Sequence, residues 1–135
     1  MSRKPIVVGP GTGRSYPMGR MRAVFKADGE ETDDAYSVSE WWLEPNTAGP
    51  PVHQHAEDHV FYVIDGTMSL LLDGQWLPAA RGSYALIPGG TPHTFENRGD
   101  ERSGFISFNV PGGFEEQAQP IANWLAANPL GDATG

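Results

Sequence analysis

The stretch PPVHQHAEDHVFYVIDG, residues 50–66, holds three of the four histidines in the chain. His53, His55 and His59 share one parity, so on extended backbone their side chains point to the same face. Two prolines stand before them and a run of aromatic and β-branched residues follows, which favours strands. A zinc-protease helix of the H-E-x-x-H type is excluded, because Glu57 does not directly follow His55 and the helix would begin against two prolines. The stretch therefore predicts three imidazoles on one interior face of a β structure.

The fourth histidine, His93, lies in a second short stretch, IPGGTPHTFEN, residues 87–97. A lone histidine is usually a surface residue or a hydrogen-bonded core residue, but several imidazoles buried together are costly unless they are protonated, hydrogen-bonded or metal-bound. Imidazole is the commonest metal-binding side chain, and a ligand from a distant strand would close a site. We expect one divalent ion per chain, of Fe, Mn, Ni, Cu or Zn, with four ligands: His53, His55, His59 and His93.

Turn signals recur along the chain, which has 17 glycines and 12 prolines. Their spacing of mostly seven to ten residues in the second half is typical of a many-stranded antiparallel fold. Asp73-Gly74 is expected to form the tight turn of a hairpin. The strands are expected at residues 21–27, 36–44, 60–64, 67–72, 75–79, 83–87, 93–97 and 104–110.

Several of these strands are apolar on both faces, which is typical of a closed barrel or sandwich with something packed outside it, such as a partner subunit. The pattern changes after residue 113. Phe114, Ala118, Ile121 and Leu125 recur with helical spacing and predict a helical tail at about 114–128, which Pro120 would split or begin. The last residues, 128–135, are expected to fray.

Length and composition narrow the classes of function. A chain of 135 residues predicts one domain, 1–135, with its barrel core at about 20–110. Its net charge of -8 disfavours binding to nucleic acid or to anionic membranes. The absence of cysteine excludes disulfides, thiolate ligands and a cysteine nucleophile. No apolar run is long enough for a signal peptide or a membrane span, so a soluble cytoplasmic protein is expected.

The two histidine stretches resemble the two metal-binding motifs of the cupin superfamily. The first motif runs G-x5-H-x-H-x3,4-E-x6-G, and the histidines and Gly66 stand at its spacings. The second runs G-x5-P-x-G-x2-H-x3-N and is matched without a gap by Gly82, Pro88, Gly90, His93 and Asn97. The resemblance implies an all-β, single cupin barrel, a double-stranded β-helix or jelly roll, with a short C-terminal helix. Among subfamilies, the chain is similar to bacterial single-domain, quercetin-dioxygenase-like cupins.

Two positions depart from the family pattern. Gly49 stands four residues before His53, where the motif has its glycine six residues before. His59 occupies the position of the motif glutamate. Four neutral imidazoles would leave a divalent ion its full charge and favour an anionic or enolate-like substrate oxygen. Such a ligand set also lacks the motif carboxylate, which could act as a base. Glu57 could act as the base instead.

Further residues are candidates around the ion. Glu57 and Tyr84 are predicted to act as acid or base, and aromatic lining would suit a planar or largely apolar molecule. Asn97 could orient a ligand or satisfy a strand end. Trp41 and Trp42 are expected on opposite faces, and Glu40 and Glu96 are expected to face outward. The expected substrate pocket comprises Phe25, Trp41, Phe61, Met68, Phe95 and Asn97.

The resemblance implies a metal-dependent enzyme that acts on a small enolisable or phenolic molecule, foremost a dioxygenase-type oxidoreductase. A non-oxidative isomerase or lyase would use the ion only as a Lewis acid. A non-catalytic small-molecule or metal-binding module is the alternative from another class, since a fold does not fix function. A homodimer is expected from the doubly apolar strands and from the family.

Overall fold

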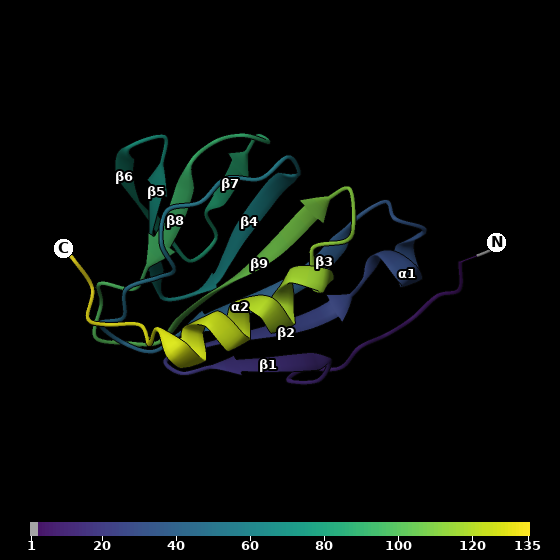
Figure 1. Cartoon of the computed structure of the whole chain (residues 1–135), viewed down its shortest axis with the longest axis horizontal. Coiled ribbons are helices and arrows are strands. Elements are labelled where there is room, and N and C mark those ends of the chain that lie inside the picture. Colours follow the sequence, from purple (N-terminus) through teal and green to yellow (C-terminus); the bar gives the residue numbers. More distant parts are fainter. Residues whose placement is uncertain (1–2) are drawn as a thin grey trace.

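The computed structural model describes residues 3–135 and has two antiparallel sheets (Figure 1). The larger sheet has the strand order β1-β2-β3-β9-β4-β7 and the smaller has the order β6-β5-β8. The strands are β1 (Arg14–Met18), β2 (Met21–Ala27), β3 (Ser37–Leu43), β4 (Asp58–Asp65), β5 (Thr67–Leu72), β6 (Gln75–Ala80), β7 (Tyr84–Ile87), β8 (His93–Glu96) and β9 (Ser103–Val110). The predicted all-β jelly roll is confirmed, although the strands described form two sheets and not one continuous hydrogen-bonded barrel.

Two helices complete the fold: α1 (Gly29–Thr32) and α2 (Glu115–Ala127). The short C-terminal helix is confirmed, and it runs through Pro120 without a break. The pyrrolidine nitrogen there has no hydrogen to donate, so that turn lacks one backbone hydrogen bond. Buried Ala118 and Leu125 face the core, and α2 lies along β1 and β2 (Figure 1). No helix within residues 3–135 has the length and apolarity that crossing a bilayer requires.

Alternating side chains give the larger sheet an inner and an outer face. Buried and partly exposed residues alternate along β3, so Trp41 is buried while Trp42 faces outward under the Arg102 guanidinium, 4.1 Å from its ring centroid. The inner faces of both sheets share one core, in which Phe105 contacts Phe61 and Phe95 at centroid distances of 4.2 and 4.9 Å. The two indoles therefore lie on opposite faces, as expected.

The hairpin of β5 and β6 forms as the sequence predicts. Leu72 pairs with Gln75, and the two turn residues, Asp73 and Gly74, have φ of 50° and 83°. Positive φ at both central positions is the type I′ geometry that suits a two-residue hairpin. Pro78 lies in β6, which pairs only with β5 and is therefore an edge strand, where a missing N–H is tolerated.

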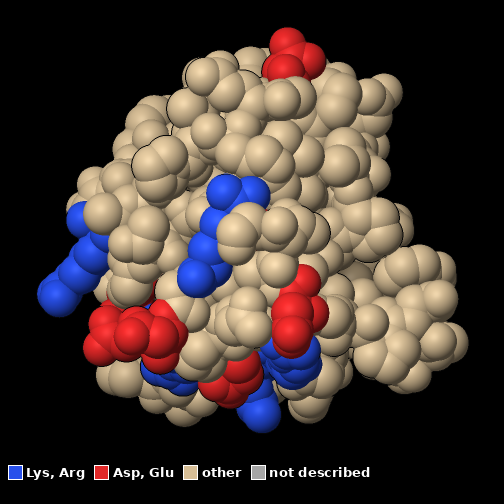
Figure 2. Space-filling model, turned by 90° about the vertical axis from the view of Figure 1, so that its left-hand side faces the viewer, with Lys and Arg blue, Asp and Glu red and all other residues tan. Residues whose placement is uncertain are grey.

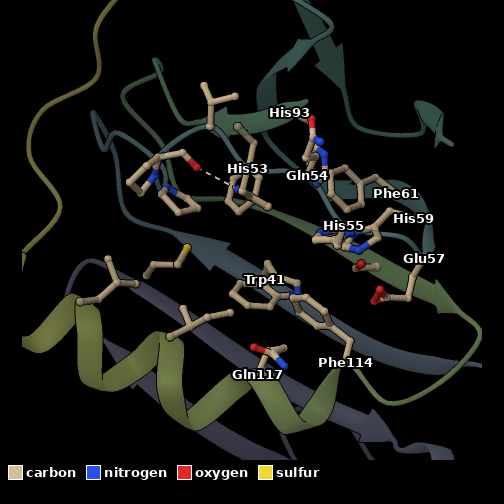
Figure 3. Close-up of a pocket in the computed structure, with 18 of the residues that line it drawn as sticks. Trp41, His53, Gln54, His55, Glu57, His59, Phe61, His93, Phe114 and Gln117 are labelled. Atoms are coloured by element: carbon tan, nitrogen blue, oxygen red, sulfur yellow. Dashed lines mark hydrogen bonds between the residues drawn. The ribbon is translucent and has the colours of Figure 1, made fainter. Parts of the chain in front are cut away.

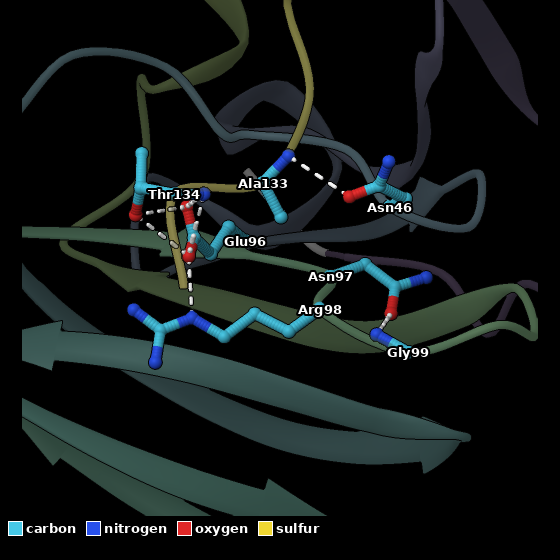
Figure 4. Close-up of polar contacts among 7 residues, drawn as sticks. All are labelled: Asn46, Glu96, Asn97, Arg98, Gly99, Ala133 and Thr134. Carbon is cyan, nitrogen blue, oxygen red and sulfur yellow. Dashed lines mark hydrogen bonds and ion pairs between the residues drawn. The ribbon is translucent and has the colours of Figure 1, made fainter.

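The C-terminal residues pack against the smaller sheet and do not fray. The Ala48 N–H donates to Gly131 O at 2.9 Å, and Thr134 donates from its N–H and hydroxyl to the Glu96 carboxylate (Figure 4). Arg98 Nε also donates to Glu96. Glu96 does point to the outer face of β8, but the tail covers it and leaves it 2 % exposed. Glu96 thus points outward as expected, but it is covered, and strand parity could not show that a later segment covers it.

Replacing Glu96 with glutamine is expected to lower the free energy of unfolding by about 1.5–3 kcal/mol at neutral pH, since hydrogen bonds to a charged group are lost. Burial alone would raise the pKa of Glu96, but the hydrogen bonds from Arg98 and Thr134 and the Arg98 charge lower it below its ordinary value. The stabilisation is therefore present above pH 4.5 and lost as the pH falls through the lower folded value. Urea unfolding at several pH values measures this. The exposed Glu101→Gln serves as the control, and an equal loss in both variants would contradict the assignment.

Charged side chains are distributed unevenly on the face in Figure 2, which is the left-hand side of Figure 1. Lys and Arg are interspersed with Asp and Glu in the lower half, and the upper half is largely uncharged. Mixed signs at short spacing screen one another, so this face forms no large field of one sign.

Candidate metal centre

The two histidine stretches meet at a backbone bridge. His53, in the loop before β4, exchanges two hydrogen bonds with His93, the first residue of β8: N–H to O distances are 3.0 and 2.9 Å. His55 lies two residues further along the same loop. One nitrogen from each of His53, His55 and His93 lies within 4.8 Å of the others. Three imidazoles from two distant segments thus converge on one point.

Backbone carbonyls orient two of these rings in the same way. His53 Nδ1 donates to Pro51 O and His93 Nδ1 donates to Thr91 O, each at 2.8 Å and each to the residue two positions earlier. A proton on Nδ1 leaves the lone pair on Nε2. Outer hydrogen bonds of this kind fix the tautomer and ring orientation of metal-binding histidines.

The buried nitrogens that remain favour a cation. Both ring nitrogens of His55 and Nε2 of His93 are buried and have no hydrogen-bond partner within residues 3–135. Burial lowers the pKa of His93 to about 4, and burial followed by the neighbouring His53 lowers that of His55. Neutral imidazole is the form that binds metal. The three residues therefore fit a divalent ion.

His59 lies beside this cluster and is not part of it. Its ring stacks on His55 with a centroid distance of 4.0 Å and an interplanar angle of 20°. It is 4 % exposed, and burial followed by the neighbouring His55 lowers its pKa to about 2. Asn109, its register partner on β9, donates an amide hydrogen to His59 Nε2. The expected set of four equivalent ligands is not confirmed.

A cavity of about 570 Å³ opens beside the histidines. Figure 3 shows the histidines on one side and Phe114 and Gln117 at the start of α2 on the other, with Trp41 between. Phe114 lies 5.3 Å from His59 and 5.7 Å from His55, ring centroid to centroid. The volume is within the range of small-molecule sites, roughly 300–1,000 Å³.

The residues predicted from the sequence fall into two groups. Trp41, Phe61, Phe95 and Glu57 line the cavity, and Glu57 is half-buried near the histidines (Figure 3).

Four predicted residues do not line the cavity. Phe25 packs behind Phe114 in the core, and Met68 is fully buried at the contact with the Ser103 hydroxyl. Asn97 donates its amide hydrogens to the carbonyls of Leu43, Glu44 and Glu101, which is a structural role. Tyr84 is 64 % exposed on the outer face of β7. These placements correct the expectations for Phe25, Met68, Asn97 and Tyr84, since strand alternation alone cannot give depth within a barrel.

Sequence reasoning missed the part of α2 that borders the site. Gln117, Ile121 and Trp124 of this helix line the cavity. The helical spacing after residue 113 indicated an apolar face, but nothing in the sequence indicated that this face covers the histidines. Asn109 was also missed, because its contact with His59 depends on the register between β4 and β9.

The lining of the cavity is largely apolar, and its charged members do not include lysine or arginine among the described residues. Among residues 3–135, those that line it include no lysine and no arginine, and its polar members are the histidines, Gln54, Glu57, Ser107 and Gln117. A site that takes phosphates or multiple carboxylates usually presents arginine or lysine. This lining favours a ligand that is uncharged over most of its surface.

Fold and site together define the class of protein. The chain belongs to the cupin family, since residues 39–109 match its cupin domain. It is 31 % identical over 124 residues to quercetin 2,3-dioxygenase of Bacillus subtilis, covering 90 % of this chain and 36 % of that enzyme. The chain thus spans about a third of the length of that relative.

Solved structures share the fold. An RmlC-like cupin from Shewanella frigidimarina superposes with a TM-score of 0.70 at 15 % identity, covering 86 % of this chain and 99 % of that one. The polyketide cyclase RemF from Streptomyces resistomycificus gives a TM-score of 0.69 at 23 % identity, covering 79 % of this chain and 80 % of that one.

Proposed function

We propose that this protein is a metal-dependent cupin enzyme of the dioxygenase type that acts on a small enolisable or phenolic molecule. The observation that carries the proposal is the convergence of His53, His55 and His93 beside an apolar cavity. The similarity to a quercetin 2,3-dioxygenase supports the reaction type. A closed structural zinc site needs four protein ligands, whereas three leave room for substrate.

A bound divalent ion would supply a Lewis acid and, when redox-active, a means of activating dioxygen. Nε2 of His53, Nε2 of His93 and a nitrogen of His55 would hold it. Trp41, Phe61 and Phe114 would exclude water and pack against the faces of a planar substrate. The Glu57 carboxylate, on the cavity wall, would accept the proton of an enol or phenol hydroxyl.

The chemistry of the cavity limits the kinds of substrate that it can bind. With no lysine or arginine among the described lining residues, the ion would be the chief positive charge available to a substrate oxygen. One enolic or phenolic oxygen on an otherwise uncharged, planar body matches this arrangement. Sugar phosphates and dicarboxylates would bring charges that no lining side chain pairs.

The proposal is tested by dioxygen uptake. Protein stripped with a chelator is reloaded separately with Fe, Mn, Co, Ni, Cu or Zn and mixed with quercetin and with small 1,3-diketones. Uptake with at least one redox-active ion, and none from His93→Ala treated in the same way, is expected. A product of unchanged mass without uptake would indicate an isomerase, and a tightly held ion with no turnover of any kind would indicate a binding module.

We also propose a homodimer that forms through the outer face of the larger sheet. Four outward side chains on the adjacent strands β9, β4 and β7 are 43–64 % exposed: Tyr62, Tyr84, Leu86 and Val110. Tyr62 pairs with Tyr84, and Val60 pairs with Leu86, so these four residues form one patch. Val110 lies at its edge, opposite Asp58. Apolar patches of this kind mark interaction sites, and a second copy would present the same apolar side chains to it.

Leu86→Glu is expected to convert the dimer to a monomer, because each interface would then bury a pair of unpaired carboxylates. Light scattering coupled to gel filtration at micromolar concentration measures the mass. Leu77→Glu is the matched control: this leucine is 40 % exposed on β6 of the smaller sheet. A wild-type monomer, or a dimer that persists in Leu86→Glu, would contradict this interface.

A further inference from the structure

The geometry of His59 is unsuited to a fourth ligand. An imidazole lone pair lies in the plane of its ring, and the rings of His55 and His59 are nearly parallel, with centroids 4.0 Å apart. An ion in the plane of one ring is therefore well out of the plane of the other. The rings that converge are strongly inclined to one another: His93 makes angles of 59° with His53 and 77° with His55.

Asn109 determines which nitrogen of His59 carries the proton. An amide nitrogen can only donate, so the bond from Asn109 Nδ2 makes His59 Nε2 an acceptor. The neutral ring then has its hydrogen on Nδ1. Ser107 Oγ lies 3.5 Å from Asn109 Oδ1 and donates to it. Asn109 itself is fully buried, and it stands directly opposite His59 in the β4–β9 ladder.

The remaining nitrogen of His59 has no hydrogen-bond partner in the described part of the chain. Nδ1 is buried and finds no acceptor within residues 3–135, although His59 lines the cavity. A buried donor without a partner costs roughly 1–3 kcal/mol. Such a group in a cavity wall points to a ligand that satisfies it, and the partner that an N–H requires is an acceptor atom.

We propose that His59 is a hydrogen-bond donor to a substrate oxygen, through Nδ1–H, and that Asn109 is the residue that positions it. Three histidines would then hold the ion, and His59 would hold a substrate oxygen. The inference rests on the proposed metal site and deepens it: the substrate presents an acceptor oxygen to His59 and an apolar body to the rest of the cavity. A neutral donor at this point also favours negative charge that develops on that oxygen.

The first test determines which ring nitrogen of His59 carries the hydrogen. Long-range ¹H–¹⁵N correlation spectra of chelator-treated protein distinguish protonated from bare imidazole nitrogens. The hydrogen of His59 is expected on Nδ1, as in His53 and His93. A hydrogen on Nε2 of His59 would overturn the inference.

The second test adds one equivalent of zinc to the same sample. Large ¹⁵N shifts are expected at one nitrogen each of His53, His55 and His93, and none of that size at His59. If His59 shifts with the others, the inference fails while the metal site stands. If no histidine responds, the proposed function itself fails.

Two variants complete the design. Asn109→Asp presents only acceptors, so the proton is expected to move to Nε2 of His59 and to leave Nδ1 without a hydrogen to donate. His59→Phe keeps a ring but has no donor. Zinc-loaded His59→Phe is expected to bind acetohydroxamate about tenfold more weakly than wild type, the loss of one hydrogen bond, with zinc affinity unchanged. Equal acetohydroxamate affinity, or no binding to wild type, would overturn the donor role.

Discussion

Replacing Gly49 with alanine is expected to separate the two histidine segments and to destabilise the fold by at least about 3 kcal/mol. A Cβ at this position would lie 1.6 Å from the carbonyl oxygen of Phe95, a backbone atom that cannot rotate away. Gly49 stands between two bridges, Thr47 to Asn97 and His53 to His93. The clash therefore pushes the loop away from β8 at the point where both carry ligands.

Urea unfolding and zinc titration of Gly49→Ala measure the two consequences, and both stability and zinc affinity should fall together. The matched control is Gly131→Ala, since an added Cβ there meets nothing within 4 Å and φ is not in the left-handed region. Wild-type zinc affinity in Gly49→Ala would show that the loop can yield without moving His53.

His93→Ala is expected to have the largest effect on metal binding. One of three ligands is lost, and the other two cannot fix the position of an ion. The loss of zinc affinity should therefore exceed the roughly 10–100-fold cost of losing an outer hydrogen-bond partner. Calorimetric titration of chelator-treated protein with zinc measures it.

Gln54→Ala is the control for this measurement. Gln54 lines the cavity and lies between His53 and His55 in the sequence, but it holds no place in the cluster. The zinc affinity of Gln54→Ala should match that of the wild-type protein. A His93→Ala protein that binds zinc as tightly as Gln54→Ala would exclude His93 as a ligand.

The β fold could be predicted because its signals are local. The Asp73-Gly74 turn and the alternation around Trp41 depend on neighbours in the sequence, and both are confirmed. β1 at Arg14–Met18 was not predicted, since its residues are mostly exposed and include a proline. It forms because it pairs with β2, and the sequence of β1 alone does not indicate this pairing.

The site could be predicted only in part for the same reason. Parity put His53, His55 and His59 on one face, and three of the four histidines do converge. Parity could not show that His59 would accept a hydrogen bond from Asn109, 50 residues away in the sequence. Nor could it show that α2 would lie beside the histidines, because helix docking is decided by contacts that are distant in sequence.

The paired backbone hydrogen bonds between His53 and His93 have a thermodynamic consequence. The fold already fixes the main chain around these two residues, so the backbone loses little conformational freedom when an ion binds. The entropy gained when water leaves the hydration shell of the ion should then exceed the conformational entropy that the polypeptide loses on binding. Exchanging one divalent metal for another should leave the backbone of the barrel almost unchanged.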